Sequence, residues 1–101
     1  MGTDDLNTLL SVEFEVFGQV QGCFFTKYCK DLALQLGITG WVKNTKMGTI
    51  VGKLQGRKAE LEHMLDWLST TGSPGCKIER CELRNWVYLT RFDYNDFSIR
   101  F

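Results

Sequence analysis

The residues best placed to do chemistry lie in one glycine-bounded segment, Gly18-Gln19-Val20-Gln21-Gly22-Cys23-Phe24-Phe25. This segment joins an alternating stretch to a helical one, so it ends at a helix N-terminus, where backbone N–H groups are unpaired. The helix dipole favours an anion there, and glycines let successive N–H groups converge on it. A simple glycine turn has the same spacing. The segment therefore predicts either a plain turn or a loop that binds an anion.

Four cysteines and one histidine are the other candidates for nucleophilic or metal chemistry. The first ten residues lack the basic start and apolar core of an export signal, so we expect reduced thiols in the cytosol. The cysteine spacings, C-x5-C and C-x4-C, are not the C-x2-C pairs of a zinc site. His63 lies on the polar side of a predicted helix and is expected at the surface. The sequence therefore predicts no metal and no cofactor; the cysteines are Cys23, Cys29, Cys76 and Cys81.

Composition argues against several classes of partner. Twelve Lys and Arg residues balance twelve Asp and Glu residues, so the formal net charge is zero. That balance disfavours nucleic-acid binding by phosphate neutralisation and a polybasic membrane patch. No stretch approaches the roughly 18 consecutive apolar residues of a membrane span. With 101 residues, 44% of them hydrophobic, the chain can bury one core. We expect a soluble cytoplasmic protein without a nucleic-acid or membrane partner.

Hydrophobic periodicity predicts the elements that position the loop. Residues 11–17 alternate between apolar and polar, which is typical of a half-buried strand. Apolar side chains recur at i, i+4, i+7, i+8 and i+11 from Phe25, which predicts a helix that Gly37 would cap. In chain order, the predicted elements are a strand from Ser11, a helix over 25–36, strands over 40–45 and 49–55, a helix over 58–69, a strand from Lys77 and a short strand over 97–101.

The order β-α-β-β-α-β with an extra C-terminal strand predicts an α+β fold. Two βαβ units in tandem form a ferredoxin-like sandwich, an antiparallel sheet with two helices on one face. We expect residues 1–10 to be a flexible N-terminal extension and residues 11–101 to form the domain. This fold hosts many functions. The third strand lacks the aromatic side chains of an RNA-recognition domain, and the first loop lacks the C-x-x-C of a metal chaperone.

Two segments of the chain resemble the acylphosphatase family. The loop from Gly18 resembles the signature G-x-V-Q-G-V-x-F-R, and residues 40–50 match the block G-W-V-x-N-T-x-x-G-T-V. Further similarity runs through Gln55-Gly56, Trp67-Leu68, Gly72-Ser73-Pro74 and residues 94–99, so the resemblance covers roughly residues 11–101. It implies a ferredoxin-like fold and a metal-free hydrolysis that cleaves the carboxyl-phosphate bond of acyl phosphates to give a carboxylate and inorganic phosphate.

The resemblance also implies roles for particular residues. In the family, loop amides and an arginine bind the phosphate, and an asparagine positions the attacking water; these roles carry over to residues 19–25 and to Asn44. Such an attack on phosphorus needs placement and charge stabilisation rather than a strong protein nucleophile. Thr26 stands at the arginine position and offers one neutral hydrogen bond instead of a charged fork. Lys27 points about 100° away around the helix, and we expect it to be a solvated charge.

The sequence therefore leaves two hypotheses for function. The first is an acylphosphatase whose activity Thr26 strongly reduces, by about 10³-fold if the loss resembles that of other phosphoryl-transfer arginines. The second is a non-catalytic relative that binds an anion or a protein partner through the retained loop. In either case we expect the loop to bind a small molecule, namely an acyl phosphate, inorganic phosphate or sulfate. We expect the protein to be a monomer.

Overall fold

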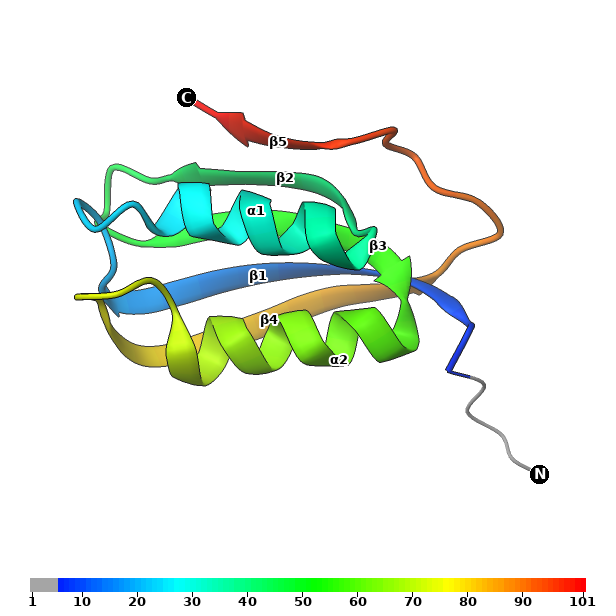
Figure 1. Cartoon of the computed structure of the whole chain (residues 1–101), viewed down its shortest axis with the longest axis horizontal. Helices are drawn as coiled ribbons and strands as arrows, with labels where there is room; N and C mark the ends of the chain where they lie inside the picture. Colours follow the sequence, from blue (N-terminus) through cyan, green and yellow to red (C-terminus); the bar gives the residue numbers. More distant parts are fainter. Residues whose placement is uncertain (1–5) are drawn as a thin grey trace.

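Five strands and two helices make up the computed structural model, which describes residues 6–101 (Figure 1). The helices pack on one face of the sheet, and the other face is open. None of the described helices is long and apolar enough to cross a membrane. In chain order, the elements are β1 (Leu9–Gln19), α1 (Phe25–Leu36), β2 (Thr39–Asn44), β3 (Ile50–Arg57), α2 (Lys58–Asp66), the π-helical segment η1 (Trp67–Thr71), β4 (Lys77–Tyr88) and β5 (Phe97–Arg100).

The sheet has the strand order β4-β1-β3-β2-β5 and is mixed rather than antiparallel throughout. Its pairs β1–β3, β1–β4 and β2–β3 are antiparallel as expected, but β5 runs parallel to β2. The reason lies in residues 89–96, which cross the end of the sheet and reverse the chain (Figure 1). Since β4 and β2 run in opposite directions, a strand that reverses direction after β4 runs in the same direction as β2 and is parallel to it. The ferredoxin-like α+β class is confirmed, with this one parallel pair at the edge.

The core lies between the helices and the sheet, and it fixes how each helix is rotated about its axis. In α1 the side chains of Phe25, Cys29 and Ala33 are buried, in agreement with the predicted periodicity. Gly37 caps this helix with φ 71°, as expected for a left-handed C-terminal glycine. The buried hydrophobic residues are Val12, Phe14, Val16, Val20, Phe25, Cys29, Ala33, Ile38, Val42, Ile50, Leu54, Leu61, Met64, Leu68 and Phe97.

Both ends of β1 extend beyond the predicted strand. Leu9 and Leu10 pair with β3, so part of the expected extension belongs to the sheet, and residues 1–5 lie outside the described residues. At the other end Gly18 is still in β1 and pairs with β4. Its φ is 135°, and a Cβ there would collide with the carbonyl oxygen of Lys77. The glycine is therefore needed for the close approach of two strands, and the loop proper spans residues 20–24.

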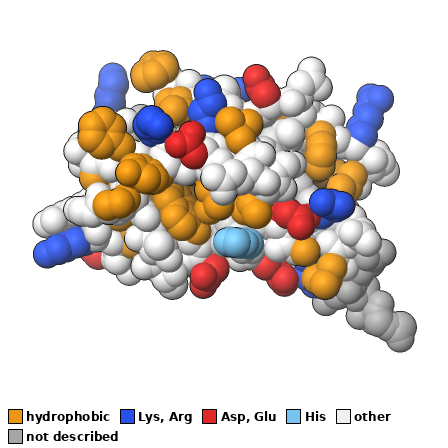
Figure 2. Space-filling view, in the orientation of Figure 1, with side chains coloured by type: hydrophobic (Ala, Val, Ile, Leu, Met, Phe, Trp, Pro, Cys, Tyr) orange, Lys and Arg blue, Asp and Glu red, His pale blue; other side chains and the backbone are white. Residues whose placement is uncertain are grey.

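The second predicted helix is shorter than expected and changes type. Its α-helical part, α2, ends at Asp66 and continues into the π-helical segment η1, which carries the chain to residue 71. The N–H of Gly72 then donates to the carbonyl oxygen of Trp67 at 2.9 Å. On the described surface that Figure 2 shows, basic and acidic side chains are interspersed around groups of hydrophobic ones. This distribution agrees with the zero formal charge of the chain.

Candidate functional site

The loop over residues 20–24 lies at the same end of the molecule as the turn between β2 and β3 (Figure 1). The N-terminus of α1 begins there too, because the loop leads directly into Phe25. The sheet thus brings together two segments that the sequence separates by about twenty residues: the glycine-bounded loop and Asn44-Thr45, where β2 ends and the turn begins. The predicted site residues lie in these two segments, except Thr26, which is the second residue of α1.

The backbone of the loop has an unusual conformation at two positions. Gly22 has φ 81° and Phe24 has φ 59°, both in the left-handed region. For a bulky residue this conformation is a true outlier, and the Phe24 side chain is 73% exposed, so burial does not explain it. Phe24 is also the N-cap of α1, and no side chain caps the helix. Left-handed residues next to an uncapped helix start form an N–H concavity suited to an anion.

Gln21 connects this loop to the turn beyond β2. Its side-chain Nε2 donates to the carbonyl oxygen of Thr45 at 2.8 Å and to that of Thr49 at 2.9 Å. Both amide hydrogens are used in these bonds. The sequence predicted Gln21 as part of the phosphate-binding loop. In the structure its side chain is committed to the turn, so any contact that it makes with an anion comes from its backbone.

The turn is itself held by a chain of hydroxyl hydrogen bonds. Thr49 Oγ1 donates to Glu15 Oε2 at 2.7 Å, so in the 2.7 Å contact between Thr45 and Thr49 the proton comes from Thr45. Thr45 Oγ1 in turn accepts the N–H groups of Met47 and Thr49, each at 3.2 Å. The hydroxyl of Thr45 is therefore saturated as donor and acceptor. These bonds hold the residues that follow Asn44 in one conformation.

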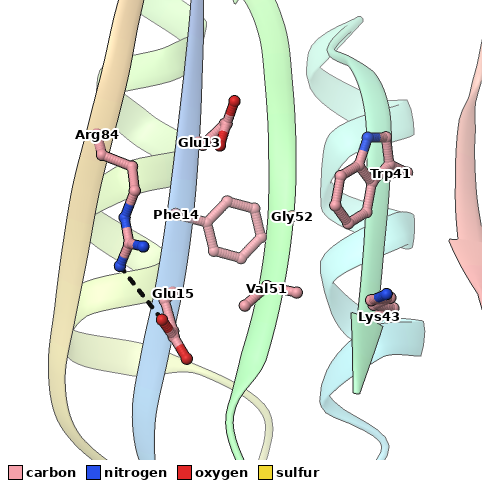
Figure 3. A pocket seen from close by; sticks show the side chains of 8 residues that line it. All are labelled: Glu13, Phe14, Glu15, Trp41, Lys43, Val51, Gly52 and Arg84. Atoms are coloured by element: carbon pink, nitrogen blue, oxygen red, sulfur yellow. Dashed lines mark hydrogen bonds and ion pairs between the residues drawn. The ribbon is translucent and has the colours of Figure 1, made fainter. Parts of the chain in front are cut away.

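Glu15 extends this chain across the open face of the sheet. Its Oε1 accepts a hydrogen bond from Arg84 Nη2 at 3.2 Å, and the two side chains form an ion pair, drawn as the dashed line in Figure 3. A hollow of about 280 Å³ on this face is lined by Glu13, Phe14, Glu15, Trp41, Lys43, Val51, Gly52 and Arg84. It contains none of the predicted site residues.

Asn44 is the last residue of β2 and pairs with Ile50 of β3. Trp41 and Lys43 project from the open face of the sheet, away from the helices (Figure 3). Because side chains alternate along a strand, the buried Val42 and Asn44 belong to the face that the helices cover. The Asn44 side chain is exposed and makes no hydrogen bond within residues 6–101. Its amide is thus available for a ligand or a water molecule at the end of the sheet where α1 begins.

Thr26 is the second residue of α1 and is half-buried. Its hydroxyl makes no hydrogen bond to any other described residue. Lys27 lies on the outer surface of the helix and pairs with Asp31 at 3.3 Å, with both side chains more than half exposed. It is therefore the solvated charge that the helical spacing predicted. A shallow hollow of about 300 Å³ lies beside it, lined by Phe24, Lys27 and Tyr28.

The thiols and the histidine do not form a catalytic or metal centre in the described part of the chain. Cys29 is buried in the core and Cys81 is half-buried, and burial raises the pKa of both thiols. A raised pKa keeps them protonated and poorly nucleophilic. His63 is exposed on α2. Within residues 6–101, no three His, Cys, Asp or Glu side chains come together as a metal site.

Comparison with known proteins gives one consistent result. The acylphosphatase family model matches residues 12–99. The chain is 45% identical over 93 residues to Acylphosphatase-1 of Homo sapiens, which covers 92% of this chain and 94% of that protein. Among solved structures, an acylphosphatase from Coxiella burnetii is 30% identical with a TM-score of 0.80, over 92% of this chain and 94% of that one. An acylphosphatase from Bacillus subtilis is 25% identical with a TM-score of 0.81, over 91% and 99%.

Proposed function

The chain belongs to the acylphosphatase family, and we propose that it hydrolyses the carboxyl-phosphate bond of small acyl phosphates to a carboxylate and inorganic phosphate. The reaction takes place where the loop over residues 20–24, the start of α1 and Asn44 come together. The observation that carries the proposal is the Asn44 amide, which has no hydrogen bond in the described chain. It belongs to the helix-covered face, at the same end of the molecule as the uncapped start of α1 (Figure 1).

In this mechanism the loop and the helix N-terminus hold the phosphate group. Their N–H groups and the helix dipole stabilise the negative charge on its oxygens. The predicted binding residues are Gln19, Val20, Gln21, Gly22, Cys23, Phe24 and Phe25, which act mainly through their backbones. Val20 is buried and the Gln21 side chain is engaged elsewhere, so neither offers a side chain to the ligand.

Asn44 positions the attacking water in the same mechanism. Its amide oxygen accepts a hydrogen bond from one O–H of the water, which directs a lone pair of the water at phosphorus, in line with the bond to the acyl oxygen. As the new P–O bond forms, the bond to the acyl oxygen breaks and its electron pair leaves with the carboxylate. The second water proton passes to a phosphate oxygen. A carboxylate is a stable anion at neutral pH, so the leaving group needs no general acid.

Thr26 lowers the rate without removing the site. A hydroxyl contributes one neutral hydrogen bond to the phosphate, whereas a guanidinium would contribute two charged ones. A charged group on a transferring phosphoryl is worth about 10³-fold or more in rate. We therefore propose an acylphosphatase with strongly reduced turnover. The alternative that Thr26 favours is a non-catalytic relative that binds an anion or a protein partner through the same loop.

Hydrolysis of benzoyl phosphate by wild-type protein and by Asn44→Ala tests the enzyme. We expect wild-type protein to exceed the spontaneous rate and Asn44→Ala to lose the excess, while inorganic phosphate still binds to the variant. Asn95→Ala is a matched control, because Asn95 is exposed on the connection between β4 and β5 and its loss should leave the rate unchanged. A wild-type rate equal to that of buffer, with phosphate still bound, would replace the enzyme with the non-catalytic alternative.

We also propose that the protein works as a monomer in the cytoplasm. All the groups invoked above come from one chain, so the site needs no second subunit. Its ligand is a small molecule, because two glycines and a few N–H groups recognise a phosphate group and little else. Analytical ultracentrifugation of the active protein should give one species with a mass near 11.6 kDa.

A further inference from the structure

We infer that Lys30 supplies the positive charge that Thr26 does not, and that its ammonium group binds the phosphate of the substrate. Lys30 lies on α1 one helical turn after Thr26. The inference rests on the proposed function, because it concerns how the same phosphate group is held. With this role for Lys30, the site keeps one positive charge although Thr26 is uncharged. That charge lies one helical turn after position 26.

The rotation of α1 places Lys30 on the flank that Thr26 occupies. Residues four apart lie on one helix face, and both side chains are half-buried. Phe25 marks the side of α1 that faces the second helix, because its ring packs against Trp67 of η1 with centroids 5.1 Å apart. At about 100° per residue, Cys29 and then Thr26 and Lys30 follow in order around the helix. Their flank is therefore turned away from Trp67. The side of α1 that lies opposite α2 is next to β2 and β5 (Figure 1), and β2 ends at Asn44.

A lysine at this position can reach the loop. Helical side chains lean toward the N-terminus and cover the preceding turn. Four residues of helix rise about 6 Å, a length that the four-carbon stem of lysine can span. Thr26 is short and makes no hydrogen bond within the described residues. The Lys30 ammonium can therefore lie over Thr26, at the height where the N–H groups of the loop and the helix start face the ligand.

Lys30 is also available, which Lys27 is not. In the described chain Lys30 has no ion pair and no hydrogen bond, although its side chain is half-buried. Lys27 is paired with Asp31 at 3.3 Å and points to solvent. A partly buried lysine packs its aliphatic stem on the protein while its ammonium reaches outward, and a bound phosphate would give this ammonium a counter-ion. Lysine binds phosphate as a point charge, so it would restore attraction but not the two-pronged orientation that arginine gives.

The substitution Lys30→Met tests the inference, with Lys27→Met as the matched control. Both variants remove one ammonium from the same helix and keep a flexible apolar stem. We expect Lys30→Met to lower kcat/KM for benzoyl phosphate by about 10–100-fold, and to weaken inhibition by inorganic phosphate at least as much, as for loss of a charge-assisted hydrogen bond. Lys27→Met should change either quantity by less than about twofold, as for an exposed ion pair. Lys30→Arg should keep most of the activity.

A phosphate titration followed by NMR separates this inference from the proposed function. If wild-type protein hydrolyses benzoyl phosphate and Lys30→Met behaves like Lys27→Met, the inference is wrong and the enzyme stands. If wild-type protein binds phosphate without hydrolysis and Lys30→Met weakens that binding, the enzyme proposal is wrong and the inference stands. If wild-type protein neither hydrolyses benzoyl phosphate nor binds phosphate, both are wrong. Circular dichroism of each variant checks that α1 remains folded.

Discussion

The side-chain amide of Gln21 donates a 2.8 Å hydrogen bond to the carbonyl oxygen of Thr45. This bond joins the loop after β1 to the residue directly after Asn44, so the two halves of the proposed site are connected by one side chain. A catalytic arrangement loses rate steeply when its parts are displaced by about 1 Å. Gln21 therefore acts as a positioning residue, although it lies within the loop that holds the phosphate.

Replacing Gln21 by alanine should uncouple the loop from the turn. The carbonyl oxygens of Thr45 and Thr49 each lose one hydrogen bond and keep one from a backbone N–H. At about 0.5–1.5 kcal/mol for each lost bond, we expect the free energy of unfolding to fall by about 1–3 kcal/mol. The rate with benzoyl phosphate should fall by about tenfold or more, as for a displaced catalytic group. Urea denaturation and steady-state kinetics measure the two effects. Gln35→Ala, an exposed change on α1, is the control; equal effects of both variants would contradict this role for Gln21.

Much of the fold could be predicted from the sequence because its signals are local. The helix over residues 25–36 and the cap at Gly37 follow from one apolar stripe and one glycine, and both are confirmed. The parallel pairing of β5 with β2 could not be predicted, because the sequence of residues 89–96 has no periodicity from which the path of this connection could be inferred. The end of α2 was also predicted three residues too late, because the apolar spacing continues into a π-helical segment.

The candidate site was predictable in its parts but not in its connections. The family resemblance and the glycine spacing pointed to the loop and to Asn44. The left-handed conformation of Phe24 left no trace in the sequence, because glycine and asparagine are the residues that usually signal it. The bonds from Gln21 to Thr45 and Thr49 join residues more than twenty positions apart. A polar side chain at that distance finds its partners only when the sheet has formed.

Gly18 should tolerate substitution far less well than a glycine that has positive φ but open space around it. In Gly18→Ala the new Cβ would collide with the backbone of β4 at Lys77, and φ 135° is itself unfavourable for alanine. The strands β1 and β4 would have to move apart, and we expect a loss of at least about 2 kcal/mol in unfolding free energy. Gly75→Ala is the matched control, since φ is 84° there but nothing lies within 4 Å of the added atom. Similar melting temperatures for the two variants would refute the collision.

Thr49→Val should break the hydroxyl chain that holds the turn after Asn44. The valine cannot donate to Glu15 or accept from Thr45, so two polar groups lose a partner. We expect a loss of about 1–3 kcal/mol in unfolding free energy. The kcat should also fall, because Asn44 is no longer held in one position. Thr90→Val, an exposed change far from the turn, should affect neither quantity; wild-type kcat in Thr49→Val would show that the turn does not need this bond.

The buried thiol of Cys29 should make stability depend on alkaline pH. Burial raises its pKa above the ordinary value of 9.0, so the folded protein keeps a proton that the unfolded chain releases. The stabilisation is complete below pH 9 and is lost as the pH rises above that value, because deprotonation favours the unfolded state. Urea denaturation between pH 8 and 10.5 should show this fall, and Cys29→Ala should make it smaller, leaving the part that comes from Cys81, whose pKa is also raised by burial. The same slope in Cys29→Ala as in wild-type protein would contradict this prediction.

The change Thr26→Arg should restore the activity that the threonine lowers, and it should make Lys30 dispensable. A guanidinium one turn before Lys30 would give the phosphate two charged hydrogen bonds, and we expect the rate to rise by on the order of 10³-fold. Inorganic phosphate should inhibit more strongly, and the melting temperature should change little, since Thr26 makes no hydrogen bond in the described structure. In the Thr26→Arg background, Lys30→Met should lower the rate by a several-fold smaller factor than it does in the protein with Thr26, because both cations would bind the same anion.

Kinetics of the four proteins, wild type, each single variant and the double variant, measure the coupling directly. Additive effects would mean that Lys30 and residue 26 act on different groups, and a folded Thr26→Arg protein without activity would mean that the site lacks more than this charge.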